Sequence, residues 1–589
     1  MTGAAWLTLA VVVVAVYVLA RDLFSPALTI LSAVVTLLVL GVITPEQAFS
    51  GFSNPAPITV AALFVLAGAV EKTGALQPLV EAVLGSANGH RRLLGRIAVP
   101  VAGASAFLNN TPIVAMFAPQ VAAWAERNGL SPSRFLMPLS FASILGGMVT
   151  LIGTSTNLVV SGLLEATGRP ALGMFELTPI GLPVALVGVA LIAVLAPLVL
   201  KDRRSPHIQA AEEVREFAVN MDVVAGGPVD GLTVEAAGLR QLRGLFLVEI
   251  RRDQEWIGPV TPQSTLHGGD RLTFVGRADE VVEIQKSRGL VSAERDHLEL
   301  FDSPDHTFFE VVIGAASPLV GHTLKEAEFR GQYQAAVVAI HRAGQRVKDK
   351  LGRVPLKVGD TLILLADPGF RDRWRDRPDF LLVSQLGGSP PIPSGKAWLV
   401  GAVALGIVLA AATGLMPILN AALLGAVALL ALRVISPREA RAAVDLDVII
   451  VIAAAFGLAA AIEGSGLADV VAGLIVDGLG AFGAAGALAG VVVATVILTE
   501  LVTNNAAAVL LFPVAMTAAA DVGVDPRGFA IALALAASAS FLTPIGYQTN
   551  TMVYGAGGYR FTDYPRLGAP LTAIVIAAVV TLVAAAYMV

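Results

Sequence analysis

Ser105-Ala-Phe-Leu-Asn-Asn-Thr-Pro112 and Thr499-Glu-Leu-Val-Thr-Asn-Asn505 are polar stretches that interrupt two long apolar runs, residues 92–125 and 484–516. In hydrocarbon, irregular backbone persists only inside protein or beside a water-filled cavity, because every N–H and C=O group needs a partner. Asn or Thr caps free N–H groups at a helix start, and Pro suits the first helical position. The stretches therefore predict helix breaks facing a cavity. Each run is either two membrane crossings or one re-entrant hairpin.

Ten further apolar runs are long enough to cross the roughly 30 Å hydrocarbon core of a bilayer. They cover residues 5–20, 26–43, 56–70, 135–164, 175–200, 397–412, 416–433, 447–462, 528–555 and 568–588. The chain is 55% hydrophobic, and its mean hydropathy is +0.74. This pattern predicts a polytopic α-helical membrane protein. The complete lack of cysteine excludes disulfides and thiolate-based metal or catalytic sites.

Charged residues concentrate in the middle of the chain. Residues 201–395 contain 53 of the 85 Lys, Arg, Asp and Glu residues, so they are about 27% charged and the rest about 8%. Soluble proteins are about 25% charged, and we therefore expect a soluble insert between two hydrophobic parts. The low charge elsewhere excludes an ordinary soluble enzyme, and the net charge of −5 argues against nucleic-acid binding.

Basic residues decide between the two interpretations of the interrupted runs, because Lys and Arg accumulate in short cytoplasmic loops. If both runs are re-entrant, sixteen basic residues of the hydrophobic parts and their borders fall on one side. Only Arg169 and Arg527 fall on the other. This predicts a multi-pass protein of the cell (inner) membrane, with the N- and C-termini outside and residues 201–395 in the cytoplasm.

The two hydrophobic parts repeat each other. Ile43-Thr-Pro-Glu46 matches Ile435-Ser-Pro-Arg438 at an offset of 392 residues, and Asn110 matches Asn504 at 394. Since each part has five spans, an odd number, the second part starts on the opposite side of the membrane. We therefore expect two inverted repeats of five transmembrane helices plus one re-entrant hairpin each.

A second pair of polar interruptions lies within the fourth span of each part. These are Gly153-Thr-Ser-Thr-Asn157 and Pro544-Ile-Gly-Tyr-Gln-Thr-Asn550, 393 residues apart when aligned on their glycines. Inverted repeats with broken helices are typical of secondary transporters that bind substrate near the membrane midplane. Apart from Glu500 the four interruptions carry no charged residue. An anion would therefore be held by neutral donors, with Na⁺ bound to oxygen ligands as the compensating charge.

The interruptions resemble those of the divalent anion:sodium symporter family of the ion-transporter superfamily, which carries Ser-Asn-Thr at both hairpin tips. The tips here, Asn109-Asn110-Thr111 and Thr503-Asn504-Asn505, each depart from that motif while keeping its central Asn. The resemblance implies one sodium site at Ser105, Asn109, Asn110 and the Gly153 carbonyl, and a second at Thr499, the Val502 carbonyl, Asn504 and the Gly546 carbonyl. It implies substrate contacts from Asn110, Thr111, Thr154, Thr503, Asn504, Asn505 and Tyr547. It also implies a homodimer and an elevator-type motion.

The altered tips bear on the substrate. In the dicarboxylate members of that family the two intact motifs are associated with two carboxylates, and members with a large insert resemble the sulfate-transporting branch. We therefore expect a sodium-coupled symporter that imports a divalent anion, with sulfate favoured and a C4 dicarboxylate such as succinate as the alternative. A ligand-gated channel is the alternative of another class. An enzyme is not expected, because the breaks lack a nucleophile–base pair.

The insert contains its own repeat at an offset of 90 residues. Gly231, Thr233, Arg240, Val248, Ile250, Gly269, Asp270 and Leu272 recur as Gly321, Thr323, Arg330, Val338, Ile340, Gly359, Asp360 and Leu362. This predicts two small α/β domains, at 201–300 and 301–395, between membrane repeats at 1–200 and 396–589. They resemble the TrkA-C lobes of regulators of potassium conductance, which implies a nucleotide-like regulatory ligand. The insert's histidines (His207, His267, His297, His306, His322 and His341) show no metal-ligand spacing, and we expect them at the surface.

Overall fold

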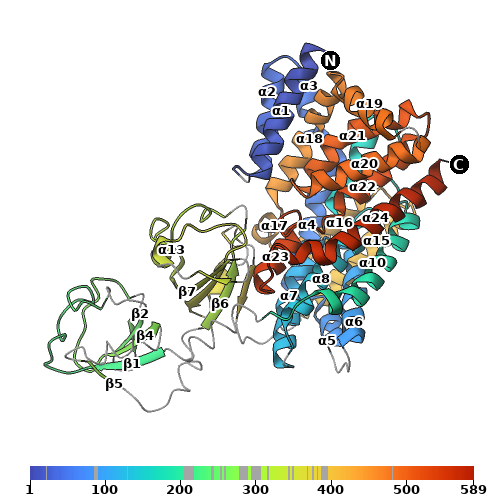
Figure 1. Ribbon diagram of the computed structural model, residues 1–589. Helices are drawn as coiled ribbons and strands as arrows, with labels where there is room; N and C mark the ends of the chain where they lie inside the picture. The colour runs from blue at the N-terminus through green and yellow to red at the C-terminus, as the bar shows by residue number, and fades with distance from the viewer. Residues whose placement is uncertain are drawn as a thin grey trace. The chain divides into compact units, whose positions relative to one another are not determined.

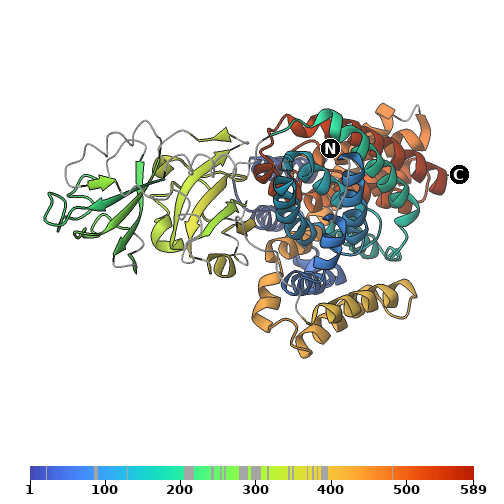
Figure 2. The same cartoon turned by 90° about the horizontal axis from the view of Figure 1, so that it is seen from below.

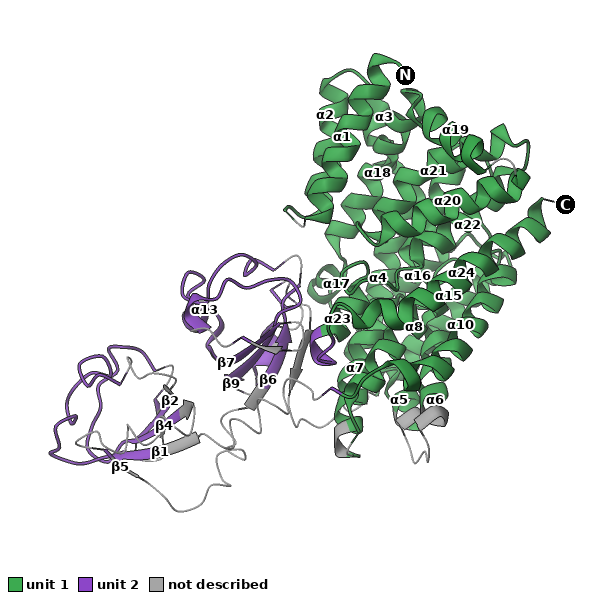
Figure 3. Cartoon of the chain, viewed as in Figure 1, with its two compact units in different colours: residues 1–202, 390–554, 560–589 green, residues 203–389, 555–559 purple. Residues whose placement is uncertain are grey.

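A computed structural model describes the chain except for residues 22, 85–89, 129, 204–217, 240–244, 253–254, 258–259, 277–289, 293–306, 315–316, 343–344, 348–350, 368, 375–376, 378, 381, 386–394, 480–481 and 589. The chain forms two compact units (Figure 3). The first is helical and contains residues 1–202, 390–554 and 560–589. The second contains residues 203–389 and 555–559. The division into four domains stays a prediction.

The helices of the first hydrophobic part have an order that the second part repeats (Figure 1). The first part comprises α1 (Gly3–Ala20), α2 (Pro26–Val39), α3 (Pro45–Phe49), α4 (Pro55–Thr73), α5 (Gln77–Leu84), α6 (His90–Ser105), α7 (Asn110–Arg127), α8 (Leu136–Gly147), α9 (Ser155–Ala166) and α10 (Thr178–Val199). The second comprises α15 (Ala397–Ala412), α16 (Ile418–Ala431), α17 (Pro437–Ala443), α18 (Leu446–Gly464), α19 (Leu467–Leu479), α20 (Gly483–Thr499), α21 (Asn504–Asp521), α22 (Pro526–Ser538), α23 (Gln548–Ala556) and α24 (Asp563–Tyr587).

Local sequence signals explain why equivalent helices start and stop at equivalent places. The short helices α3 and α17 both begin with a capping box, formed by Thr44 with Gln47 and by Ser436 with Glu439. In each box the side chains satisfy two backbone N–H groups that a helix start leaves free. α4 ends at Gly74, whose positive φ of 63° is a conformation that glycine adopts without strain.

The two parts pack into each other. α2 packs against α18, and α16 packs against α4, so the second helix of each part contacts the fourth helix of the other. Buried side chains of α2, α18 and α21 form one apolar core, and those of α4, α15 and α16 form another. α15 and α16 lie at one edge of the helical unit (Figure 2). Burial between the parts therefore ties residues about 400 positions apart into one unit.

Fewer helices are long enough to cross a membrane than the ten apolar runs predicted. Within the described residues, five qualify by length and composition: Gly3–Ala20, Pro45–Thr73, Thr178–Val199, Leu446–Gly464 and Asp563–Tyr587. α2 and α16 have 14 residues each, about 21 Å at 1.5 Å per residue. The runs 135–164 and 528–555 are each two helices with a break between them. The first break contains Gly153, and the second contains Pro544 and Gly546.

The helical unit exposes large apolar side chains along its outer helices. Trp6 on α1 is 60% exposed, Trp398 on α15 is 70% exposed, and Leu415 beside α16 is 75% exposed. Such extensive apolar exposure is unfavourable in water and marks a surface that contacts lipid or another protein. The helical unit is therefore built for a membrane.

The second unit contains two five-stranded antiparallel sheets of the same strand order. The order is β3-β2-β4-β1-β5 in the first sheet and, read from the equivalent edge, β8-β7-β9-β6-β10 in the second. The two orders then correspond strand for strand at the offset of 90 residues. The strands are β1 (Ala218–Val223), β2 (Leu245–Arg252), β3 (Glu255–Ile257), β4 (Arg271–Gly276), β5 (Leu290–Ser292), β6 (Thr307–Val312), β7 (Ala335–Arg342), β8 (Gln345–Arg346), β9 (Thr361–Ala366) and β10 (Leu382–Gln385).

The 90-residue repeat is also visible in equivalent hydrogen bonds of the two sheets. Arg252 donates to both carboxylate oxygens of Asp270, at 2.7 and 2.8 Å, and Arg342 donates to both oxygens of Asp360, at 2.7 Å each. Among the described residues of this unit the helices are short: α13 (Phe329–Tyr333), α14 (Phe370–Trp374) and a 3₁₀ turn at Leu351–Arg353. The sheets therefore dominate the described part of what we expected to be α/β domains.

One expectation for the insert is wrong. His341 is only 2% exposed and lies on β7, which is flanked by β9 and β8 in the second sheet. His267 and His322 are exposed, as expected. His207, His297 and His306, together with Arg240 of the repeat, lie outside the described residues.

Candidate cation and substrate site

Four helix breaks supply the polar residues of the candidate site. α6 ends at Ser105 and α7 begins at Asn110, and the equivalent break in the second part separates α20 from α21. The other two breaks separate α8 from α9 and α22 from α23. α9 packs against both α21 and α22, and α8 against both α6 and α7. This packing brings breaks from both parts of the sequence to one region.

Oxygen atoms converge at the first hairpin tip. Ser105 Oγ donates to the Ser143 carbonyl at 2.8 Å and also contacts the Asn110 side-chain oxygen. With its oxygen inward, the Asn110 amide faces two backbone carbonyls, of Ser143 and Gly153, each at 3.3 Å, whereas the rotated amide would donate to both of them and to Ser105 Oγ. Gly153 comes this close because it lacks a side chain: a Cβ there would lie 2.6 Å from the Gly147 carbonyl oxygen. With the oxygen inward these oxygens suit a hard cation, and with the nitrogen inward they are satisfied by the amide itself.

The second hairpin tip repeats this geometry. Thr499 Oγ1 donates to the Ala537 carbonyl at 2.6 Å, 38 residues onward, as Ser105 does to Ser143. It also hydrogen-bonds the Asn504 side-chain oxygen at 2.9 Å. Ser105, Asn110, Thr499 and Asn504 are buried. Each tip therefore holds a hydroxyl, an amide oxygen and a backbone carbonyl in equivalent places.

Two further asparagines brace the other breaks. Asn157 donates from its amide to the carbonyls of residues ten and seven positions earlier, Gly147 at 3.1 Å and Thr150 at 2.9 Å. Asn550 makes the equivalent bonds, to the carbonyls of Ser540 at 2.9 Å and Thr543 at 3.2 Å. These bonds satisfy carbonyls that the broken helices leave free. Both breaks are therefore held in fixed shape.

Neutral hydrogen-bonding groups from the two parts of the chain meet beside these tips. Asn110 Nδ2 donates to the Tyr547 hydroxyl at 2.6 Å, and Thr154 Oγ1 lies 3.4 Å from the same hydroxyl. Thr156 Oγ1 donates to the Asn505 side-chain oxygen at 3.0 Å. Further bonds link Thr111 to Gln548, and Ser155 to Asn505. This cluster offers hydroxyls and amides without a charged side chain.

Three predicted residues lie at the edge of this arrangement. Asn109 is half-buried and lines a small, mainly apolar pocket that also includes Phe64, Phe107 and Ser155. Thr503 is exposed and caps α21, where its hydroxyl accepts from the Ala506 N–H at 3.4 Å. Val502 is buried at the hairpin tip with a side chain in an apolar core. The sodium and substrate roles of these residues stay predictions.

Sequence reasoning missed several groups of the site. Ser143 and Ala537 contribute backbone carbonyls, which every residue type carries, so no sequence signal points to them. Gln548 and Ser155 lie within the polar interruptions of the two fourth spans, so their position in the sequence could have identified them as site residues. Ser540 is buried and takes the place that Gly147 has in the first part. The offset of 393 residues could have identified it as a difference between the two repeats.

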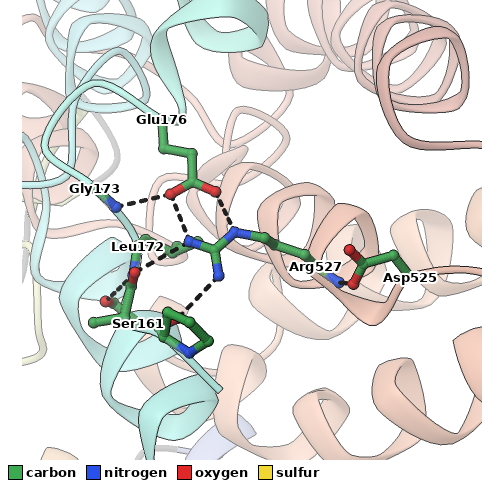
Figure 4. A network of polar contacts seen from close by, with 8 residues as sticks. Ser161, Leu172, Gly173, Glu176, Asp525 and Arg527 are labelled. Atoms are coloured by element: carbon green, nitrogen blue, oxygen red, sulfur yellow. Dashed lines mark hydrogen bonds and ion pairs between the residues drawn. The ribbon is translucent and has the colours of Figure 1, made fainter.

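An ion pair outside the breaks joins the two parts (Figure 4). Arg527, at the start of α22, pairs in bidentate fashion with Glu176, which precedes α10. Arg527 also donates to the carbonyls of Pro170 at 2.9 Å and Ala171 at 3.1 Å. Burial alone would raise the pKa of Glu176, but hydrogen bonds from Arg527 and the Gly173 N–H outweigh it, and the pKa is lowered. The carboxylate thus stays charged at neutral pH.

Apolar helices with polar breaks, uncharged apart from Glu500 and gathered in one region, define a membrane transporter rather than a soluble protein. The chain belongs to the citrate transporter (CitMHS) family, whose sequence profile matches residues 9–536. The expectation of a membrane transporter is thereby confirmed.

Relatives with descriptive names match nearly the whole chain. A "Putative sulfur deprivation response regulator" of Chlamydomonas reinhardtii is 34% identical and covers 94% of this chain and 96% of its own. An "Uncharacterized transporter sll0640" of Synechocystis is 35% identical and covers 99% and 97%. "Sodium/sulfate cotransporter 1" of Chlamydomonas reinhardtii is 25% identical and covers 94% and 86%.

Proposed function

We propose that this protein is a sodium-coupled symporter that imports a divalent anion, with sulfate as the favoured substrate. One observation carries the proposal: matched oxygen clusters at Ser105–Asn110 and Thr499–Asn504 lie beside a cluster of neutral donors. Na⁺ prefers oxygen ligands, and two bound sodium ions would balance the charge of a dianion held by hydroxyls and amides. Transport is therefore expected to require both ions together.

The site residues divide by chemistry. The first sodium site uses Ser105, Asn110 and the Gly153 carbonyl, with the Ser143 carbonyl as an added ligand. The second uses Thr499 and Asn504 with the Ala537 carbonyl, and by the family resemblance the carbonyls of Val502 and Gly546. The substrate contacts come from Asn110, Thr111, Thr154, Asn504, Asn505 and Tyr547, and from Thr503 at the rim. The helix starts at α7 and α21 add positive dipole ends that favour an anion.

Asn110 provides a physical link between sodium and substrate. Its amide contacts the cation cluster with one end and the Tyr547 hydroxyl with the other. A sodium ion at the cluster requires the oxygen inward, which fixes the nitrogen outward toward Tyr547. Without the ion, a rotated amide would donate inward to the carbonyls of Ser143 and Gly153. Cation binding therefore selects the orientation that presents an N–H donor to the substrate side.

The resemblance between the parts supports two inverted repeats in the membrane. The protein would reside in the inner membrane of the cell. Both termini would lie outside, and the insert would lie in the cytoplasm. Alternating access would occur by an elevator-type motion of the broken-helix region, in a homodimer. The insert, with two sheets of TrkA-C-like repeat pattern, would regulate transport by binding a nucleotide-like ligand.

The substrate is the least constrained part. Relatives named as sodium/sulfate cotransporters support sulfate, a compact dianion that hydroxyls and amides can surround. The family's description as citrate transporters favours a carboxylate, and the C4 dicarboxylates remain the second candidate. A sulfate transporter would select sulfate over larger anions by the size of the cluster of neutral donors, because this cluster contains no charged side chain.

Transport by the purified full-length protein in liposomes tests the proposal. Labelled sulfate should accumulate under an inward sodium gradient and not under an inward potassium gradient of equal strength. Ser105→Ala and Thr499→Ala should each raise the sodium concentration for half-maximal uptake. Arg169→Gln, on an exposed loop residue, serves as the matched control. Uptake that followed a pH gradient but ignored sodium would refute the coupling, and competition by excess succinate would redirect the substrate to dicarboxylates.

A further inference from the structure

The two candidate cation sites differ in charge. In the first part, the residues at the positions of Glu500 and Ser540 are Ala106 and Gly147. Neither carries a side-chain oxygen. The second part therefore adds a carboxylate and a hydroxyl to an arrangement that is otherwise shared.

Both added groups are buried at the second break. Glu500 is 6% exposed and Ser540 is fully buried. One carboxylate oxygen of Glu500, Oε1, accepts from the N–H groups of Phe541 at 2.8 Å and Leu542 at 2.7 Å. Two N–H donors on one oxygen favour the ionised form of a carboxyl group, whereas burial opposes it. Contact between a cation and the other oxygen, Oε2, would therefore be needed to hold a negative charge beside the broken end of α22.

The remaining oxygens of these groups converge on one point. A Cβ on Gly546 would lie closest to Ser540 Oγ, and 3.1 Å from both Glu500 Oε2 and Thr543 Oγ1. Within the described part of the chain, neither Glu500 Oε2 nor Ser540 Oγ makes a hydrogen bond of good geometry. Thr543 also lies beside the Glu500 carboxyl group. Buried oxygens that converge in this way are costly unless a hydroxyl hydrogen, an ion or a water joins them.

We propose that Glu500 and Ser540 are ligands of the second sodium site, which therefore carries a fixed negative charge that the first site lacks. The proposal rests on the proposed function and extends its ligand set. The Glu500 carboxylate bridges the end of α20 and the break after α22, since Oε1 holds the backbone of residues 541 and 542 while Oε2 is left for the ion. The charged site would bind sodium more tightly and fill first.

An alternative role for Glu500 is purely structural. Its Oε1 caps two backbone N–H groups that a helix break leaves free, and such capping alone could explain a buried carboxylate. The two roles differ in what a glutamine would do. Glu500→Gln keeps an oxygen that can accept from Phe541 and Leu542 but removes the charge. A cap would survive this change, whereas a charged ligand would not.

Sodium titration of the full-length protein separates these roles. The melting temperature in a fluorescence assay is followed from choline chloride to sodium chloride at constant ionic strength, with potassium chloride as the cation control. Wild type should be stabilised by sodium specifically. In Glu500→Gln the sodium concentration for half-maximal stabilisation should rise by about 10–100-fold, the range seen when groups that support a metal ligand are removed. Ser540→Ala should raise it by a smaller factor.

The stability without sodium gives an independent readout. Because glutamine keeps the cap and needs no buried charge, Glu500→Gln should be at least as stable as wild type in choline chloride. Glu463→Gln changes an exposed carboxylate at the end of α18 and should match wild type in both salts. If Glu500→Gln does not fold, Ser540→Ala carries the test alone, because it removes an oxygen without touching the cap.

The outcomes are distinguishable. A wild type that sodium does not stabilise would contradict the proposed sodium coupling and with it this extension. A sodium-stabilised wild type whose apparent affinity is unchanged in both Glu500→Gln and Ser540→Ala would refute only the ligand assignment. A Glu500→Gln protein that matches wild type in stability and in sodium response, together with an unaffected Ser540→Ala, would identify Glu500 as a cap that glutamine can replace.

Discussion

Breaking the ion pair between Arg527 and Glu176 should loosen the candidate site from a distance. Arg527 stands at the start of α22, which leads into the second break, and Glu176 lies between α9 and α10 of the other part. The pair therefore ties the helix before one break to the segment after the other. We expect Arg527→Gln to lower the stability of the protein and to weaken sodium binding as the two breaks lose their alignment.

The expected coupling energy of this ion pair follows from its hydrogen-bond geometry and its solvent exposure. Arg527 donates two hydrogen bonds to the Glu176 carboxylate, and both side chains are 22% exposed. A hydrogen bond to a charged group contributes about 1.5–3 kcal/mol, whereas a solvent-exposed ion pair contributes about 0–1 kcal/mol. Partial exposure places this pair between those limits, so we expect a coupling energy of about 1–2 kcal/mol. The carbonyl bonds to residues 170 and 171 add to the loss in Arg527→Gln but not in Glu176→Gln.

A double-mutant cycle measures the coupling directly. The free energy of unfolding is compared in mixed micelles by titration with dodecyl sulfate for wild type, Arg527→Gln, Glu176→Gln and the double variant, since the cycle cancels effects that the single changes do not share. Arg169→Gln, whose guanidinium donates to the exposed hydroxyl of Thr167 at 3.3 Å, should stay within about 0.5 kcal/mol of wild type. A coupling energy below about 0.3 kcal/mol, the usual limit of additivity, would refute the reasoning.

Three other changes test separate parts of the structure. Gly153→Ala would place a methyl group 2.6 Å from a backbone oxygen. Overpacking of this kind lowers the free energy of unfolding by about 1–3 kcal/mol. Thermal unfolding should also show a smaller stabilisation by sodium. Asp360→Asn breaks a bidentate pair with Arg342 around a fully buried carboxylate; hydrogen exchange across residues 307–385 of the full chain should quicken, and Asp270→Asn should do the same in the first sheet. Burial would raise the pKa of Glu439, but hydrogen bonds from Lys72 and Ser436 lower it to about 2. Its small contribution should be complete above the normal carboxyl pKa near 4.3 and be lost progressively as the pH falls from there toward 2, so thermal unfolding of Glu439→Gln and wild type should differ almost equally at pH 8 and pH 5.

Pattern and composition were enough to identify the broken helices. The polar stretches at Ser105 and Thr499 interrupt apolar runs, and the structure has helix ends at both positions. The strands β2, β4, β7 and β9 coincide with short, mainly apolar runs, a pattern that favours buried strands. Helix ends and strands of this kind are determined by interactions between residues that are close in the sequence.

Helix lengths were less predictable. The apolar run 135–164 looks continuous by hydropathy, yet the structure divides it into α8 and α9. The Gly-Thr-Ser-Thr-Asn stretch had been identified as polar, but whether a span bends or breaks there depends on partners elsewhere in the fold. Asn157 supplies them by bonding two carbonyls of the break. His341 shows the same limit, since its burial depends on the neighbours of β7.

Residue types and their spacing were sufficient to predict a membrane transporter with paired breaks, a charged insert and a double repeat, because hydrophobicity, helix capping and turn chemistry act over a few residues. Only the folded chain brings Asn110 to Tyr547 and Thr156 to Asn505, 437 and 349 residues away. It also recruits the Ser143 and Ala537 carbonyls, which carry no mark of residue type. The charge difference between the two tips likewise emerges when Glu500 and Ser540 are seen to converge at Gly546, because convergence in space depends on packing between distant segments.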